Sequence, residues 1–136
     1  MEQKDYLLRE IEKIGLILNA IRQRLFGGKQ ALALSIETQF QEAKGMLWGE
    51  TGMDLNTIMS LNETELIGYV NKFEGLSTDN LELLADIIAQ FGFEASADNS
   101  EKYLDKALQL YELCNITSKT YSPEREMKIA QIKNAK

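Results

Sequence analysis

The chain has 136 residues, of which 44% are hydrophobic and 26% are charged, and its net charge is −6. This length and composition predict one soluble domain that is large enough to bury a core. The absence of histidine excludes Ser-His and Cys-His nucleophile pairs and histidine-containing zinc sites, and the single cysteine, Cys114, excludes an internal disulfide.

Residues 4–26 are predicted to form one long helix that is ended by Gly27-Gly28. Its apolar residues are separated alternately by four and three positions, which is also the heptad spacing of a coiled-coil seam. Leu8 and Ile17, with Tyr6, extend the apolar surface to more than one side of the helix, which favours self-association. The stripe therefore either packs within the chain or belongs to a self-association face, for which the candidate residues are Leu7, Ile11, Ile14, Ile17, Leu18, Ile21 and Leu25.

A second helix is predicted over residues 29–48, because its apolar residues repeat at helical spacing: Leu32, Ile36, Phe40, Ala43 and Leu47. A break is expected at Gly49 and Gly52. The short linker between two helices of about 20 residues favours an antiparallel hairpin over residues 1–48. Trp48, at the end of the second helix, is either a core anchor or an exposed aromatic for a partner, and the sequence does not choose.

Shorter helices are expected from residue 54 to residue 92. Asp54 is placed to cap a short helix that ends near Ser60. Asn62 and Glu65 have the spacing of a capping box, and Gly75 is expected to close the helix that they open. Ser77 is predicted to cap the next helix, which Gly92 is expected to end.

The remaining residues are predicted to form two helices after a polar loop at residues 96–100. One helix is expected over residues 101–118. Ser122-Pro123-Glu124 then provides an N-cap, a proline at the first helical position and an acid in the first turn. This last helix, to about residue 134, has few apolar residues to bury: Met127, Ala130, Ile129 and Ile132. No segment alternates apolar and polar residues as a strand would, so the prediction is an all-α single domain over residues 1–136, with a hairpin at 1–48 and shorter helices at 54–136.

Several motifs resemble catalytic or ligand sites but fail in detail. Gly27-Gly28-Lys29 lacks the first glycine and the Ser or Thr of a phosphate loop, and the possible calcium loop that starts at Asp54 has Met59 where glycine is needed. Glu82 and Asp86 are one helical turn apart and are interpreted as solvated surface. Cys114 lies on an apolar helix face near a C-terminus and is expected to be buried and inert. We therefore expect no catalytic, cofactor-binding or metal-binding residues and no enzymatic activity.

The net charge is distributed unevenly. Residues 1–30 carry six basic and four acidic side chains, residues 31–105 carry three and fourteen, and residues 106–136 carry six and three. The acidic middle argues against a nucleic-acid-binding protein, which would show a basic stripe. The longest uncharged run, residues 14–21, is too short to span a membrane, and the first residues, charged from the second position, do not form a secretory signal. With a single free cysteine, this pattern predicts a cytoplasmic protein.

The segment from Ser77 onward resembles one degenerate tetratricopeptide repeat. The resemblance rests on Gly92-Phe93 and on the pattern Tyr103-Leu104-x-x-Ala107-Leu108-x-Leu110-Tyr111, in which Ala107 and Leu108 match the small-large pair of the family's second helix. In that family, antiparallel helix pairs stack, three or more together, into a concave groove for peptides. The resemblance therefore implies a helical bundle with a repeat-like C-terminal part.

The whole chain also resembles a family of short bacterial all-helical proteins of unknown function. The motifs are Asp5-Tyr6-Leu7-Leu8-Arg9-Glu10-Ile11-Glu12, Gly52-Met53-Asp54-Leu55 and Ser60-Leu61. This resemblance brings no activity and no catalytic residues. The sequence thus favours a non-enzymatic protein-interaction or scaffolding module, with a protein partner or a second copy of the chain bound through the first helix. The alternatives are a small-molecule-binding protein or enzyme with an inter-helix pocket that uses carboxylate, Tyr or Lys groups, and a nucleic-acid-associated regulator if the basic ends cluster.

Overall fold

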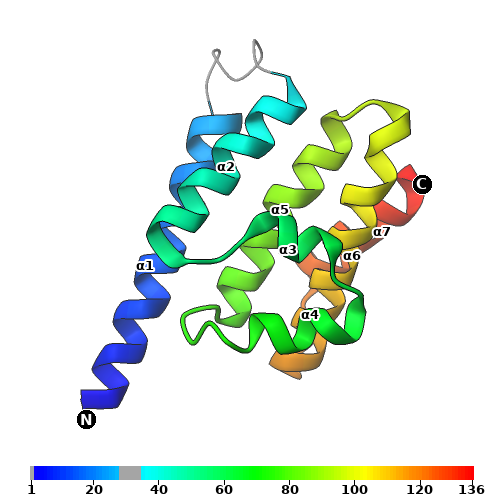
Figure 1. The fold of residues 1–136 in the computed structure, drawn as a ribbon. Helices are drawn as coiled ribbons and strands as arrows, with labels where there is room; N and C mark the ends of the chain where they lie inside the picture. Colours follow the sequence, from blue (N-terminus) through cyan, green and yellow to red (C-terminus); the bar gives the residue numbers. More distant parts are fainter. Residues whose placement is uncertain (1, 28–34) are drawn as a thin grey trace.

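The computed structural model describes residues 2–27 and 35–136 (Figure 1). These residues form seven α-helices and no strand, which confirms the predicted all-α class. The helices are α1 (Glu2–Phe26), α2 (Ile36–Thr51), α3 (Leu55–Ser60), α4 (Glu63–Val70), α5 (Thr78–Glu94), α6 (Ala97–Ser118) and α7 (Pro123–Ala135). In the described part of the chain, none of these helices combines the length and the apolar character that a membrane span requires.

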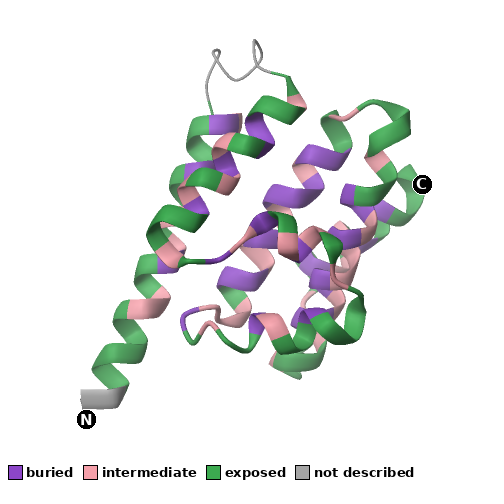
Figure 2. Ribbon diagram, in the orientation of Figure 1, coloured by how far each residue is buried: buried purple, intermediate pink, exposed green. Residues whose placement is uncertain are grey.

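Helix α5 lies at the centre of the fold. It packs most extensively against α6 and also contacts α1 and α2, while α7 packs against α6 and the short α3 contacts α2 and α6. Figure 1 shows α1 and α2 side by side on one flank and α5 and α6 as a second antiparallel pair. The buried residues gather where these pairs face each other, with α5 between α1 and α6 (Figure 2). Four rings, those of Phe26, Phe40, Phe91 and Tyr103, meet there with centroids 5.5–5.9 Å apart.

Several predicted helix starts are confirmed. Asn62 accepts a hydrogen bond from the backbone N–H of Glu65, whose carboxylate accepts one from the N–H of Asn62, so the capping box is complete. Ser77 caps α5 and Ser122 caps α7, with Pro123 at the first helical position. Asp54 caps α3 through the N–H of Asn56.

The second helix differs from its predicted bounds. It begins at Ile36, where Ser35 accepts a hydrogen bond from the backbone N–H of Thr38, and residues 28–34 lie outside the described part of the chain. It runs past Gly49 to Thr51, because the residue that adopts the left-handed conformation at its end is Gly52, with φ of 74°. Trp48 therefore lies within α2, and it is 60% exposed.

The connection between α5 and α6 is also shorter than predicted. Gly92 does not end α5, which continues to Glu94, and α6 already begins at Ala97. Gly92 is buried against the neighbouring helix, and a Cβ added to it would lie 2.6 Å from Cδ2 of Leu104. The glycine thus permits close packing of two helices rather than terminating one. Ser100 supports this contact by donating to the carbonyl of Gly92 at 2.7 Å.

The face that α7 buries differs from the prediction for two of its four apolar residues. Ile129 and Ile132 are 7% and 1% exposed and belong to the core, as expected. Met127, however, is 66% exposed, and Ala130 is also exposed. The buried face instead includes the charged residue Arg125, which is 5% exposed. Its partners, described below, lie on the side of α7 that faces the core.

Candidate functional site

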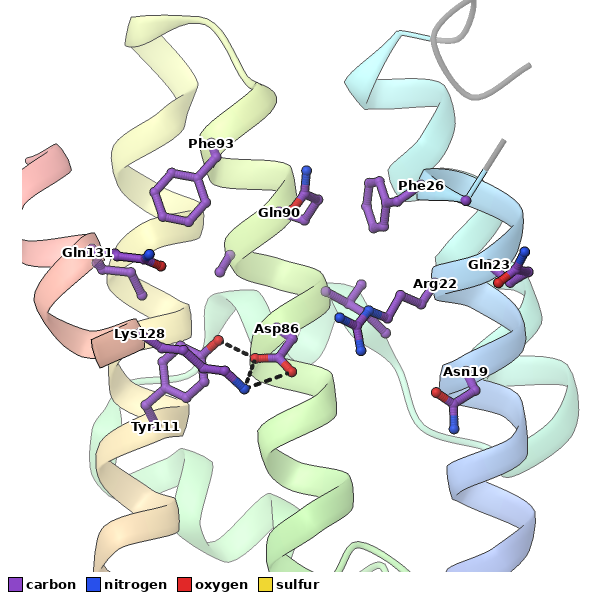
Figure 3. Close-up of a pocket in the computed structure, with 14 residues that line it drawn as sticks. Asn19, Arg22, Gln23, Phe26, Asp86, Gln90, Phe93, Tyr111, Lys128 and Gln131 are labelled. Atoms are coloured by element: carbon purple, nitrogen blue, oxygen red, sulfur yellow. Dashed lines mark hydrogen bonds and ion pairs between the residues drawn. The ribbon is translucent and has the colours of Figure 1, made fainter. Parts of the chain in front are cut away.

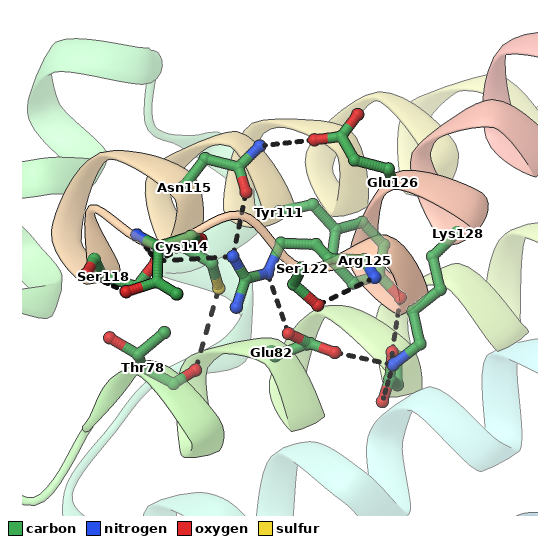
Figure 4. A network of polar contacts seen from close by, with 12 residues as sticks. Thr78, Glu82, Tyr111, Cys114, Asn115, Ser118, Ser122, Arg125, Glu126 and Lys128 are labelled. Atoms are coloured by element: carbon green, nitrogen blue, oxygen red, sulfur yellow. Dashed lines mark hydrogen bonds and ion pairs between the residues drawn. The ribbon is translucent and has the colours of Figure 1, made fainter.

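A polar network joins α5 to α7 (Figure 4). Glu82 and Asp86, one turn apart on α5, face Arg125 and Lys128 on α7. Nε of Arg125 donates to Oε1 of Glu82 at 2.8 Å, and Nζ of Lys128 lies 2.8 Å from Oε2 of Glu82 and 3.1 Å from Oδ1 of Asp86. The two carboxylate side chains are each 18% exposed, so the interpretation of Glu82 and Asp86 as solvated surface is wrong.

Arg125 is the buried member of the network, and a second nitrogen of its guanidinium also has a partner. Its Nη1 donates to Oδ1 of Asn115 at 2.9 Å, and the amide of Asn115 in turn donates to Glu126 at 3.3 Å. A buried guanidinium is tolerated only when its charge and its N–H groups are satisfied in this way. The network therefore fixes the position of α7 on α5 and α6.

The ionisable groups around the network hold fixed protonation states near neutral pH. Burial, together with the hydrogen bond from its hydroxyl to Asp86 at 2.5 Å, raises the pKa of Tyr111. Burial alone would lower the pKa of Lys128, but its hydrogen bonds to Glu82 and Asp86 outweigh this effect and raise it. Burial likewise opposes ionisation of Glu82, yet the hydrogen bonds from Lys128 and Arg125 lower its pKa. Lys128 and Tyr111 thus keep their protons, so neither is set up as a general base or a nucleophile.

Cys114 is free and buried, as predicted. Its Sγ lies 3.8 Å from the carbonyl oxygen of Thr78, as a weak donor would. Burial raises the pKa of the Cys114 thiol to about 12, so the reactive thiolate is scarce at neutral pH.

A pocket of about 660 Å³ lies between α1, α5 and α7, and the network forms part of its lining (Figure 3). Tyr111, Asp86 and Lys128 line it on one side. The other lining residues include polar side chains and apolar ones, namely Asn19, Arg22, Gln23, Gln90 and Gln131 with Phe26, Ile87, Phe93 and Ile132. This volume falls within the range of pockets that bind small molecules.

Arg22 differs from the other charged residues that line this pocket. Lys128 and Asp86 pair with each other, whereas the side chain of Arg22 makes no hydrogen bond or ion pair with any residue in the described ranges 2–27 and 35–136. Figure 3 shows its side chain extending from α1 toward α5. The lining therefore carries one unbalanced positive charge in a chain whose net charge is −6.

The structure divides the predicted self-association face between the core and the surface. Four of its residues are at most 3% exposed and belong to the core: Ile14, Leu18, Ile21 and Leu25. Ile17 and Ile11 are half-buried, and Leu7 is 38% exposed. Every residue from Lys4 to Arg9 is exposed, and this part of α1 extends beyond the rest of the molecule (Figures 1 and 2).

Among the described residues, no group of three or more His, Cys, Asp or Glu side chains is placed to hold a metal ion.

The sequence predicted neither the α5–α7 network nor the pocket beside it. The available signal was a pair of acids four residues apart, Glu82 and Asp86, and a pair of bases three residues apart, Arg125 and Lys128.

Comparisons of the chain with models of known protein families, with curated proteins and with solved structures found no match.

Proposed function

We propose that this chain is a non-enzymatic protein-interaction module that self-associates through the N-terminal part of α1. One observation carries this proposal: the apolar stripe of α1 continues past the body of the protein. Leu7 and Ile11 lie one turn apart and in register with the buried residues Ile14 and Leu18, and Leu8 lies beside them, one turn from Ile11. A projecting helical segment of about two turns has little stability in water by itself, so a contact that buries these side chains stabilises it.

A second copy of the chain is the partner that the charge distribution favours. Residues 4–13 carry three basic and three acidic side chains, whereas the whole chain has a net charge of −6. Two copies repel each other when their acidic middle segments approach, and this repulsion weakens beyond a Debye length of about 8 Å at physiological salt. A contact through the neutral end of α1, which extends away from the body, keeps the acidic segments apart.

The proposal is tested by measuring the mass of the chain in solution by light scattering over a range of concentrations. We expect the wild type to approach twice its 15.4 kDa as the concentration rises. Leu8→Glu and Ile11→Glu place a charge in the contact and are expected to leave a monomer. The matched control is Leu16→Glu, because Leu16 is 64% exposed on the same helix but lies on the side opposite Leu7.

Two results would overturn the proposal. One is a wild type that stays monomeric at every concentration. The other is a dimer that survives both Leu8→Glu and Ile11→Glu. Ile14 is unsuitable for this test, since it is 3% exposed and a charge there would unfold the chain.

We also propose that the protein is cytoplasmic, because a free thiol such as Cys114 stays reduced in that compartment.

A second candidate function, the binding of a small molecule between helices, is supported by the pocket beside the α5–α7 network. Its lining contains the carboxylate, tyrosine and lysine groups that such a function was expected to use, in Asp86, Tyr111 and Lys128. Because these groups are engaged with one another, they favour binding over catalysis.

A further inference from the structure

We infer that the pocket between α1, α5 and α7 binds a small organic anion in which one acidic group is attached to a flat apolar body. This inference rests on the second candidate function above and is independent of self-association through α1. Three features of the pocket carry it: an unpaired cation, a neutralised carboxylate and two aromatic rings at one end.

The unpaired cation is the guanidinium of Arg22, which lines the pocket from α1. A guanidinium presents parallel N–H donors that match the two oxygens of a carboxylate, or two oxygens of a sulfonate or phosphate. Among the described residues no acidic side chain occupies these donors. The side chain is therefore available to an acidic group that enters from solvent.

Among the described residues of the lining, the one acidic side chain does not repel such a group strongly. Asp86 accepts a hydrogen bond from the Tyr111 hydroxyl at 2.5 Å and pairs with Lys128 at 3.1 Å. Its charge is thus compensated within the network, and Lys128 is shared with Glu82. Among the described lining residues, the charge that remains uncompensated is the positive charge of Arg22.

The apolar body is expected to lie against two phenylalanine rings. Phe26 on α1 and Phe93 on α5 line the same end of the pocket (Figure 3). Phe26 is fixed by an edge contact with Phe91, with centroids 5.5 Å apart, whereas Phe93 is 47% exposed. Ile132 of α7 provides a further apolar surface. A flat ligand in this position removes the exposed ring of Phe93 from water. The acidic group of the ligand then lies on the side of Arg22.

The test uses two fluorescent probes with nearly the same aromatic skeleton and different charge. These are the anion 1-anilinonaphthalene-8-sulfonate and the neutral N-phenyl-1-naphthylamine, each titrated into the full chain. We expect both probes to bind, the anion more tightly. Arg22→Gln should lower the affinity for the anion about three- to tenfold, as expected for an exposed charge-assisted contact. It should change the affinity for the neutral probe less than twofold. Phe93→Ala should weaken both probes.

Arg9→Gln is the matched control, because it removes the same charge from the same helix at an exposed position outside the pocket. It should leave both affinities unchanged. Leu8→Glu should also leave them unchanged, which separates the pocket from the apolar end of α1. Arg22 is exposed and Phe93 nearly half-exposed, so both variants are expected to fold, and far-ultraviolet circular dichroism checks this.

Four results would overturn the inference in whole or in part. Equal losses of affinity for the anion in Arg22→Gln and Arg9→Gln would show a general effect of charge. Unchanged binding of both probes to Phe93→Ala would show that the probes bind outside the pocket. Failure of the anionic probe to bind the wild type, with or without the neutral probe, would mean that the pocket is not a site for an organic anion. Equal affinity for the two probes, with Phe93→Ala weakening both, would overturn the preference for an anion and leave the second candidate function standing.

Discussion

Asn80 donates a hydrogen bond from its side-chain amide to the backbone carbonyl oxygen of Ile11 at 2.8 Å, across 69 positions in the chain. The same nitrogen donates to the carbonyl oxygen of Gly75, also at 2.8 Å. The first turn of α5 is thereby joined both to α1 and to the loop that precedes α5. Gly15 allows the close approach, because a Cβ at that position would lie 3.0 Å from Oδ1 of Asn80.

Replacement of Asn80 by alanine is expected to lower the free energy of unfolding by about 1–3 kcal/mol, because the buried carbonyl of Gly75 loses its partner. Urea unfolding followed by circular dichroism measures this change. The control is Asn99→Ala at an exposed position of α6, which is expected to change stability by less than about 0.5 kcal/mol. Both variants gain the same helix propensity, so their difference isolates the two hydrogen bonds. Equal stabilities of the two variants would contradict the role of Asn80.

Two glycine-to-alanine substitutions are expected to act in opposite directions. A Cβ at Gly75 would lie 2.4 Å from the carbonyl oxygen of Glu10 and 2.9 Å from Cδ1 of Ile14, so Gly75→Ala must push the loop away from α1. We expect a loss of about 1–3 kcal/mol. Gly68 lies exposed within α4 with nothing within 4 Å of such a Cβ, so Gly68→Ala should stabilise the chain by up to about 1 kcal/mol. Thermal and urea unfolding measure the stability of the two variants. A Gly75→Ala variant as stable as the wild type would show that the loop is not held against α1.

The ion pair between Glu82 and α7 should make stability depend on pH in acid. The pKa of Glu82 is lower in the folded chain than its ordinary value of 4.5, so the unfolded state binds more protons as the pH falls through this range. Its contribution is complete above about pH 5 and is lost as the pH falls below 4.5 through the lowered folded-state pKa. Glu82→Gln should therefore cost about 1–3 kcal/mol at pH 7 and progressively less toward pH 3.

Urea midpoints at several pH values between 3 and 7 test this expectation. The control is Glu50→Gln, at an exposed position near the end of α2, which should follow the wild type throughout. If the difference in the free energy of unfolding between Glu82→Gln and the wild type stayed constant with pH, the lowered pKa of Glu82 would not contribute to stability.

The thiol of Cys114 is expected to resist alkylation in the folded chain. With a pKa of about 12, roughly one thiol in ten thousand is ionised at pH 8, whereas about a quarter are ionised at the unperturbed value of about 8.5. Iodoacetamide should thus label the native chain at least about a thousandfold more slowly than the chain in urea, as followed by mass spectrometry. Similar rates in the two states would mean that the α5–α6–α7 interface opens readily.

The starts of α3, α4, α5 and α7 were predictable because their signals are local. A capping box and a proline at the first helical position each involve residues within one turn, and Asn62, Glu65, Ser122 and Pro123 adopt those roles. The helix ends were less predictable, since a glycine both stops helices and permits close packing. Gly92 serves the second purpose against Leu104, which lies on another helix and is not visible in the local sequence.

The buried face of α7 and the pocket depend on contacts between distant residues. Apolar residues occur on two sides of α7, and the side that faces the core is the one on which Arg125 pairs with Glu82, so Ile132 is buried and Met127 is exposed. The pocket takes its lining from α1, α5, α6 and α7, so no single segment predicts it. For α1 the spacing of the apolar residues was predicted. Which of them are buried, such as Ile14, and which are exposed, such as Leu8, depends on where the loop before α5 crosses the helix.

The long separation between Asn80 and Ile11 has a consequence for synthesis of the protein. A ribosome adds about 5–20 residues per second, so the roughly 65 residues from Gly15 to Asn80 take about 3–13 s to follow α1 out of the exit tunnel. Throughout this interval the apolar side of α1 has neither α5 nor the Asn80 amide to bind. Neighbouring ribosomes on one messenger RNA then present the same uncovered helix, so two nascent chains can meet through α1 before either has folded.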